Sequence, residues 1–323
     1  MRGYDSTPIR ETHPPLTRPD DFFAFWAATL ETLERTPANP RLGMAVTTTD
    51  GNRITPIRFA SLGGADIQGF FVAAQAAAGD RPRPLVITTH GYNSHSNPVL
   101  DARHVASSGA DLLGFDIRGF GLSRAACAVD PDGYILTGID DPRKSILRGA
   151  VCDYVRAAEV GALLQAGGGG TVFHGRSFGG ALAIMAQAVA PRADYLVAAV
   201  PALGWAEGRR RVADGGSTQE LNQYLARRPA AEVAVMRTLA YFDTANYADR
   251  VACDALVGVG LHDTVVPPAT VYAIANRMTP QPEVMELPVS HTDLLEERHW
   301  VEFDRRWTSR VASLPLGAAR HER

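Results

Sequence analysis

A glycine-flanked serine, Ser177 in the pentapeptide GRSFG, limits most strongly how this chain can fold. Residues 171–174 before it are an apolar run typical of a strand, and residues 178–190 have a helical pattern. A serine between a strand and a helix lies in a tight turn, where side chains two positions away on either side would collide. Glycines at positions 175 and 179 remove those side chains. The motif therefore predicts a strained strand–turn–helix unit that presents the Ser177 hydroxyl at the edge of a sheet.

The chain from residue 84 onward alternates short apolar runs with helical patterns. The predicted strands are 85–89, 111–116, 171–174, 196–200, 255–260 and 283–288. The predicted helices are 143–166, 178–190 and a closing helix from about 297. Three earlier apolar runs, separated by glycine-containing turns at 50–51 and 63–64, are 44–49, 53–61 and 67–74. Alternating strands and helices pair as parallel strands covered by helices, so we predict an α/β fold with a mostly parallel central sheet and helices on both faces.

Residues 203–250 interrupt this alternation, because they contain helical patterns but no clear strand. An insertion here would lie over the carboxyl ends of the strands, where open α/β sheets bind ligands. We predict a small helical cap, with ordinary crossover helices as the alternative. We expect residues 1–17, which are polar and proline-rich, to form a surface arm. The whole chain, 1–323, is predicted to be a single domain.

A helix is predicted to begin at the sequence Pro-Asp-Asp of residues 19–21. The side chains expected to form its apolar face are Phe22, Phe23, Phe25, Trp26 and Leu30.

A serine hydroxyl needs a base, and in folds of this type the base and its acid follow the serine in the order acid, then histidine. His291 lies in a loop after the last predicted strand, where the base is expected, whereas His262 is expected to face away. Asp263, on the loop after the preceding strand, is the predicted acid that orients the imidazole. The competing acids, too near His291 in sequence to reach behind its ring easily, are Asp293, Glu296 and Glu297. We therefore predict a triad of Ser177, Asp263 and His291.

Backbone N–H groups are predicted to bind the oxyanion that forms when the serine attacks a carbonyl. The first is the N–H of Phe178, at the start of the helix after Ser177. The second is the N–H of Tyr92, in the loop HGYN of residues 90–93, where glycine allows close approach. Histidines expected to be structural are His90, His95 and His174.

No cofactor or metal is predicted, since no HExxH, P-loop or Cys/His cluster occurs. The cysteines, odd in number and far apart, are Cys127, Cys152 and Cys253, which indicates neither a disulfide framework nor a zinc site.

The composition is that of an ordinary globular protein, with 46% hydrophobic and 21% charged residues. The net charge of −3 indicates neither a nucleic-acid nor an anionic-membrane partner. Basic charge is almost all arginine, with Lys144 as the single lysine, and we expect solvated arginine faces. Without a visible signal peptide or a membrane span, the default expectation is the cytoplasm.

The chain resembles the acetyl xylan esterase and cephalosporin C deacetylase group, carbohydrate esterase family seven, over nearly its whole length. The matching segments are PDDF at 19–22, HGYN at 90–93, DIRG at 116–119, TGIDDP at 137–142, RAAE at 156–159, GLHD at 260–263 and PP at 267–268. The resemblance implies an α/β-hydrolase that removes acetyl groups from sugars or small alcohols. It carries the triad onto Ser177, Asp263 and His291, and the oxyanion donors onto Tyr92 and Phe178. It also implies a cytoplasmic homo-oligomer, a dimer or a ring-shaped hexamer with inward-facing active sites.

Three positions depart from the family pattern: Phe120 and Phe178 replace glutamines, and Thr292 replaces a glutamate. We interpret the two phenylalanines as a coupled change beside the nucleophile, which with Tyr92 would contact the substrate and favour apolar or aromatic esters. The alternative is that both are buried structural positions.

The predicted function is a serine esterase that hydrolyses a short-chain, acetyl-type ester of a small molecule through an acyl-enzyme. Its alternative is a biosynthetic tailoring enzyme of the same fold that carries out acyl transfer, thioester release or cyclisation on an apolar substrate. A third possibility is a non-catalytic ligand receptor on a hydrolase scaffold.

Overall fold

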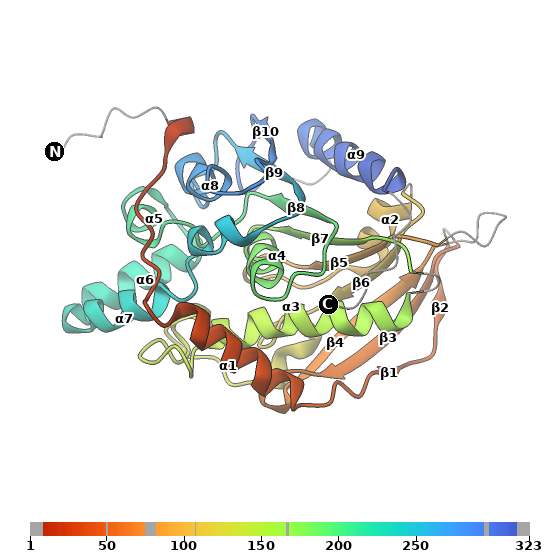
Figure 1. The fold of residues 1–323 in the computed structure, drawn as a ribbon, viewed down its shortest axis with the longest axis horizontal. Coiled ribbons are helices and arrows are strands. Elements are labelled where there is room, and N and C mark those ends of the chain that lie inside the picture. Colours follow the sequence, from red (N-terminus) through yellow and green to blue (C-terminus); the bar gives the residue numbers. More distant parts are fainter. Residues whose placement is uncertain are drawn as a thin grey trace.

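The computed structural model describes residues 9–49, 51–74, 82–106, 108–165, 168–293 and 297–314. In these residues one sheet runs through the molecule between layers of helices (Figure 1). Its strands are β1 (Arg41–Leu42), β2 (Val46–Thr47), β3 (Arg53–Ala60), β4 (Asp66–Ala73), β5 (Leu85–Thr89), β6 (Asp111–Phe115), β7 (Thr171–Arg176), β8 (Tyr195–Ala199), β9 (Asp254–Gly260) and β10 (Glu283–Leu287). The helices are α1 (Phe22–Glu34), α2 (Pro98–Ala106), α3 (Ile146–Leu164), α4 (Phe178–Val189), α5 (Ala206–Val212), α6 (Gly216–Arg227), α7 (Glu232–Leu239), α8 (Pro268–Ala275) and α9 (Arg298–Ala312).

The sheet order is β1-β3-β4-β6-β5-β7-β8-β9-β10, with β2 paired to β3. Strand β4 is antiparallel to both β3 and β6, whereas the neighbours from β6 to β10 are all parallel. The antiparallel opening and the mostly parallel sheet are therefore confirmed.

Helices cover both faces of this sheet, as two neighbouring residues of β7 show. Consecutive strand residues point to opposite faces. The Phe173 ring packs on Tyr154 of α3, with centroids 5.1 Å apart, whereas His174 packs on Trp307 of α9 at 4.8 Å. Helices α3 and α9 consequently lie on opposite faces, and the predicted α/β fold class is confirmed.

The first helix differs from its prediction in the side chains that it buries. Phe23 is 49% exposed and Leu30 is only partly buried, whereas Thr29 and Leu33 are buried. A helix buries positions spaced by three or four residues, which here run from Phe22 through Phe25 and Trp26 to Thr29 and Leu33. The adjacent Phe23 falls outside that stripe, so its predicted burial was wrong.

Residues 203–250 contain α5, α6, α7 and short 3₁₀ turns, without a strand. Figure 1 shows these three helices together at one end of the sheet, in cyan and green. The N-terminal residues 9–17 run along α8, where the Asn276 amide donates to Arg10 O at 2.9 Å and to Thr12 O at 3.0 Å. The rest of the predicted arm, residues 1–8, lies outside the described residues, as does Asp50 of the first predicted turn. The second turn is present, with φ of +73° at Gly63 and +76° at Gly64.

The expectation of solvated arginine faces was wrong for three arginines, Arg118, Arg156 and Arg209, which are 8%, 6% and 4% exposed. Arg156 shows why such burial is tolerated, since its Nη2 donates to Leu33 O at 2.6 Å and to Thr36 O at 2.8 Å. Fixed acceptors inside the protein replace the water that a guanidinium loses. Within the described residues, no helix is both long and apolar enough to cross a bilayer.

Candidate active site

Ser177 occupies the turn between β7 and α4 in a strained backbone conformation, with φ +55° and ψ −116°. Such geometry costs about 1–3 kcal/mol and survives only where neighbours enforce it. Here the Ser177 N–H donates to Ala199 O at 2.8 Å. A Cβ on Gly175 would lie 2.2 Å from Gly179 C, and one on Gly179 would lie 2.5 Å from Thr89 O. The two glycines are thus required by the close approach of α4 to β7 and β5.

His291 and Asp263 are in direct contact. His291 Nδ1 lies 2.7 Å from Asp263 Oδ2, and the other carboxylate oxygen accepts hydrogen bonds from Val265 N at 2.9 Å and Val266 N at 2.8 Å. The Asp263 side chain is fully buried, whereas that of His291 is 21% exposed. Arg176 Nη2 also donates to His291 O at 3.2 Å. The carboxylate therefore fixes the imidazole by its inner nitrogen and leaves the outer edge of the ring accessible.

The competing acidic residues have other partners. Asp293 accepts hydrogen bonds from the N–H and hydroxyl of Ser290, at 2.7 and 2.9 Å, and these bonds lower the pKa of Asp293. Glu297 accepts from His299 N at 2.7 Å, and Glu296 lies outside the described residues. His262, next to Asp263, is exposed. Among the described acids, Asp263 is the one placed against the His291 ring.

Ser177 and His291 both line two cavities that meet at this point. The larger, about 430 Å³, extends past His90 toward Trp300. The smaller, about 230 Å³, is closed by residues from the helical segment 203–250, including Arg209 and Ser217. A separate groove of about 830 Å³ is lined by the first residues of β8, β9 and β10, at the amino ends of the strands. Since Ser177 follows the carboxyl end of β7, that groove lies at the opposite edge of the sheet.

The N–H groups of Tyr92 and Phe178 donate to no residue within the described part of the chain. Both residues line the smaller cavity together with Ser177. The loop of Tyr92 approaches the serine closely, because a Cβ built on Gly91 would lie 3.7 Å from Ser177 Cβ. The two N–H groups thus have the hydrogen-bonding capacity that an oxyanion would require.

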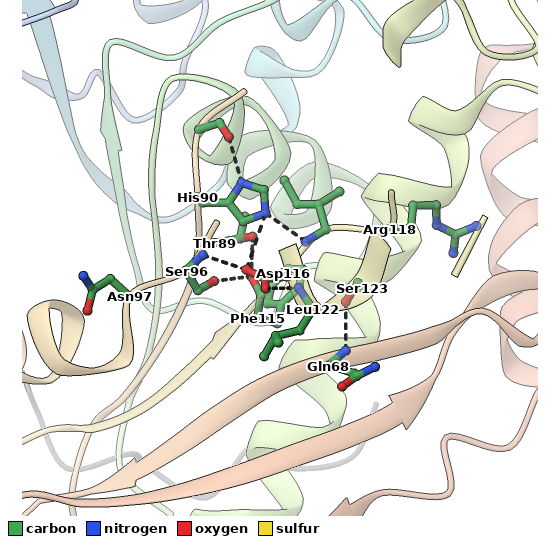
Figure 2. Close-up of polar contacts among 12 residues, drawn as sticks. Gln68, Thr89, His90, Ser96, Asn97, Phe115, Asp116, Arg118, Leu122 and Ser123 are labelled. Carbon is green, nitrogen blue, oxygen red and sulfur yellow. Dashed lines mark hydrogen bonds and ion pairs between the residues drawn. The ribbon is translucent and has the colours of Figure 1, made fainter. Parts of the chain in front are cut away.

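A polar network joins His90, two residues before Tyr92, to the segment after β6 (Figure 2). His90 Nδ1 donates to Gly91 O at 2.7 Å, and its Nε2 accepts from Ile117 N at 3.1 Å, so the ring is neutral. Burial lowers the pKa of His90, which favours the same form. Asp116 accepts from Ser96 N at 2.6 Å and from Leu122 N at 2.7 Å, tying this loop to the one after β6 (Figure 2). Both ring nitrogens of His90 are therefore engaged by backbone groups, as expected for a structural histidine.

The family model for acetyl xylan esterase (AXE1) matches residues 6–300. The chain belongs to this family. A curated relative, acetyl esterase Axe7A of Xylanibacter ruminicola, is 26% identical over 309 residues, which cover 91% of this chain and 66% of the relative. The chain thus spans just under two thirds of the length of that relative. The resemblance stated from the sequence is confirmed.

Solved structures of acetyl xylan esterases have the same fold as this AXE1 member. The enzyme from Paenibacillus sp. R4 superposes with a TM-score of 0.86 at 23% identity, covering 96% of this chain and 100% of that one. The enzyme from Thermoanaerobacterium sp. gives a TM-score of 0.83 at 23% identity, covering 95% and 99%. The α/β-hydrolase fold therefore extends over nearly the whole chain.

The two phenylalanines that depart from the family pattern join one aromatic cluster. Phe120 stacks on Tyr134 with centroids 4.3 Å apart, and Phe178 contacts Tyr134 at 5.8 Å. Both also meet the Tyr92 ring edge-on, at 5.8 Å. Phe178 is 1% exposed and lines the smaller cavity, whereas Phe120 lines neither cavity at Ser177. They are thus linked through two tyrosines, and substrate contact remains a prediction.

Glu220 and Arg209 are the residues near the site that sequence analysis missed. The Tyr92 hydroxyl donates to Glu220 on α6 at 2.5 Å, which links the helical segment to the Tyr92 loop. Burial raises the pKa of Glu220, although the hydrogen bond from Tyr92 opposes that shift. Arg209 on α5 lines the smaller cavity. The triplet of arginines at 209–211 in the predicted cap was a signal available in the sequence.

Proposed function

We propose that this protein is a serine esterase that hydrolyses a short-chain, acetyl-type ester of a small molecule. One observation carries the proposal: the imidazole of His291, held at Nδ1 by Asp263, lines the same cavities as the strained Ser177. Membership of the acetyl xylan esterase family supports the acetyl group as the acyl part. The relatives named above are acetyl and acetyl xylan esterases, and their activity comes to this chain as part of the proposal.

In the proposed reaction, Ser177 Oγ attacks the ester carbonyl while His291 takes the hydroxyl proton. The N–H groups of Tyr92 and Phe178 donate to the oxyanion, and Asp263 stabilises the imidazolium. The tetrahedral intermediate collapses, the C–O bond breaks, and His291 protonates the leaving alcohol. Water then attacks the acyl-enzyme with His291 again as base, releasing a carboxylic acid and free Ser177. Ester and water thus give acid and alcohol.

The segment 203–250 is proposed to act as a cap, because its residues Arg209, Ser217 and Thr218 line the smaller cavity together with Ser177. We also propose that the enzyme is a cytoplasmic homo-oligomer, dimer or hexamer, as the family resemblance implies. Light scattering coupled to gel filtration measures the subunit number.

Covalent labelling with a fluorophosphonate tests the proposed nucleophile. We expect wild type to be labelled and Ser177→Ala to be unlabelled, with kcat on an aryl acetate lowered by at least about 10⁴-fold. Ser313→Ala, at the end of α9 where the hydroxyl donates to Arg310 O, is the matched control and should be labelled like wild type. Persistent labelling of a folded Ser177→Ala variant would reject the assignment.

Product analysis separates hydrolysis from the tailoring alternative. Free acetate and alcohol from an acetyl ester mean hydrolysis, whereas a new ester or ring means acyl transfer or cyclisation. The acetyl xylan esterase family and the relatives named above give no support for the tailoring alternative.

A substrate panel of acetylated xylose, aryl acetates and longer acyl esters tests the apolar preference predicted from Phe120 and Phe178. Best turnover on the acetylated sugar would contradict that preference.

A further inference from the structure

Arg209 is a buried cation beside the proposed nucleophile. It lies on α5, is 4% exposed, and lines the cavity of about 230 Å³ together with Ser177 and His291. Among the described residues that line this cavity, Arg209 carries the only permanent charge, and none is a carboxylate. The cavity that Ser177 lines therefore carries a positive charge, and no described carboxylate lines it.

The guanidinium of Arg209 is almost without partners. Within the described part of the chain its only hydrogen bond is from Nη1 to Ser217 Oγ, at a weak 3.4 Å. Its Nε is buried without a hydrogen-bond partner. No carboxylate oxygen of the described residues lies within 4.0 Å of a guanidinium nitrogen of Arg209, the limit for an ion pair. Burying an unpaired charge is strongly unfavourable, so proteins rarely leave one in this state without a ligand.

The carboxylates of Asp243, whose charge acts on Arg209, and of Glu220 on α6 are already engaged. Asp243 accepts hydrogen bonds from Trp205 N at 2.8 Å, Ala206 N at 2.7 Å and Ala245 N at 3.0 Å. Glu220 accepts the Tyr92 hydroxyl. Burial lowers the pKa of Arg209 to about 10, opposed by the charge of Asp243, so the guanidinium stays protonated at neutral pH. The charge therefore persists in the cavity, and no carboxylate of the described residues is hydrogen-bonded to the guanidinium.

The two following arginines show that this state is specific to one position. Arg210 pairs with Glu232 at 2.5 Å and contacts Asn222 at 3.2 Å, whereas Arg211 is exposed to solvent. Successive residues on a helix point about 100° apart, and of the triplet only Arg209 lines the cavity that Ser177 lines.

We propose that Arg209 binds a carboxylate carried by the ester substrate, so that the enzyme prefers anionic esters over neutral ones. A guanidinium matches a carboxylate through two parallel N–H···O bonds, and both Nε and the terminal nitrogens of Arg209 lack strong acceptors. This inference rests on the proposed esterase function, since it assigns the substrate class of the same site. The carboxylate belongs to either the acyl or the alcohol half of the ester, and the two arms of the test distinguish them.

The test compares kcat/KM for matched pairs of esters. For the acyl half, para-nitrophenyl hemisuccinate is set against para-nitrophenyl isocaproate, in which an isopropyl group replaces the carboxylate. For the alcohol half, meta-(acetoxymethyl)benzoate is set against its carboxamide. We expect wild type to prefer the anionic ester by at least about 10-fold in one arm, and Arg209→Met to lower that ratio by about 10–100-fold. Arg209→Lys, which keeps the charge but cannot form the two parallel N–H···O bonds, should give an intermediate ratio.

Arg211→Met, on the same helix but exposed, is the matched control and should keep the wild-type ratio. A wild-type ratio at or below one in both arms, or an unchanged ratio in Arg209→Met, overturns the inference. If Arg209→Met does not fold, the wild-type ratios and Arg209→Lys decide. If folded wild type hydrolyses none of the four esters, the proposed function fails instead. Calorimetry with succinate and meta-(hydroxymethyl)benzoate then decides for Arg209: binding to wild type that Arg209→Met loses supports it, and no binding overturns it.

Discussion

Two buried arginines in this molecule have opposite surroundings. Arg118, on the loop after β6 (Figure 2), donates from Nε to Asp153 Oδ2 at 2.8 Å and from Nη2 to Asp153 Oδ1 at 2.6 Å. Its Nη2 also donates to Leu62 O at 3.2 Å. Arg209 is as deeply buried, yet within the described part of the chain the one hydrogen bond of its guanidinium is the long contact to Ser217. Among the described residues, the Asp153 carboxylate is hydrogen-bonded to Arg118, whereas no carboxylate is hydrogen-bonded to Arg209.

The pKa values of the two guanidinium groups shift in opposite directions for this reason. Burial alone would lower the pKa of Arg118, but the charge and hydrogen bonds of Asp153 more than offset it and raise the value. At Arg209 burial dominates and the pKa falls to about 10. Burial by itself thus says little about the role of an arginine. A saturated pair indicates a structural role, whereas an unsaturated cation that lines a cavity indicates a ligand.

The largest expected effect comes from breaking the saturated pair. Asp153→Asn keeps the side-chain size but leaves Arg118 as an uncompensated buried charge, so we expect the free energy of unfolding to fall by about 3–5 kcal/mol. Urea denaturation measures it. Asp254→Asn, which breaks the exposed ion pair with Arg310 at 3.0 Å, is the matched control and should cost at most about 1 kcal/mol. Equal losses in the two variants would mean that the buried pair of Arg118 and Asp153 contributes no more to stability than an exposed ion pair.

Some of these features could be predicted from the sequence, and others could not. The turn at Ser177 was predictable because the steric demand is local: Gly175 and Gly179 lie two residues from the serine, and β7 and α4 have clear patterns. The fold class and the mostly parallel sheet followed from the alternation of strands and helices and from the family resemblance. Helix α8 was missed although Pro268 at its first position is a helix-start signal.

The state of each arginine was not predictable, because it depends on contacts between distant segments. Asp153 lies 35 residues from Arg118 along the chain and meets it only once α3 packs against the sheet. For Arg209, the decisive facts are the rotation of α5 and the engagement of Asp243 by backbone N–H groups. The placement of His291 against Asp263, in contrast, agrees with the order of residues expected for the fold. Their catalytic roles remain predictions.

A second prediction compares the same substitution at both arginines. Arg118→Met leaves the Asp153 carboxylate buried without its partner and should cost about 3–5 kcal/mol. Arg209→Met leaves no carboxylate without its hydrogen bonds, because Asp243 keeps its three N–H donors. We expect its free energy of unfolding to stay within about 1 kcal/mol of wild type or to rise, as seen when buried charges are replaced by apolar side chains. Urea denaturation of both variants gives the comparison, and a loss at Arg209 as large as that at Arg118 would mean that Arg209 has an internal partner.

The smallest expected effect tests whether Glu220 is that partner. Burial raises the pKa of Glu220, so its protonated form is favoured by folding. The stability that this contributes is complete below the pKa of the unfolded chain and is lost as pH rises through the higher folded value. The free energy of unfolding of wild type, minus that of Glu220→Gln, should therefore fall as pH rises from about 4, by less than about 1 kcal/mol because the group is only half-buried. If Glu220 instead paired with Arg209 in solution, its pKa would be lowered and the same difference would rise with pH. The sign of the slope therefore decides whether Glu220 is the counterion of Arg209.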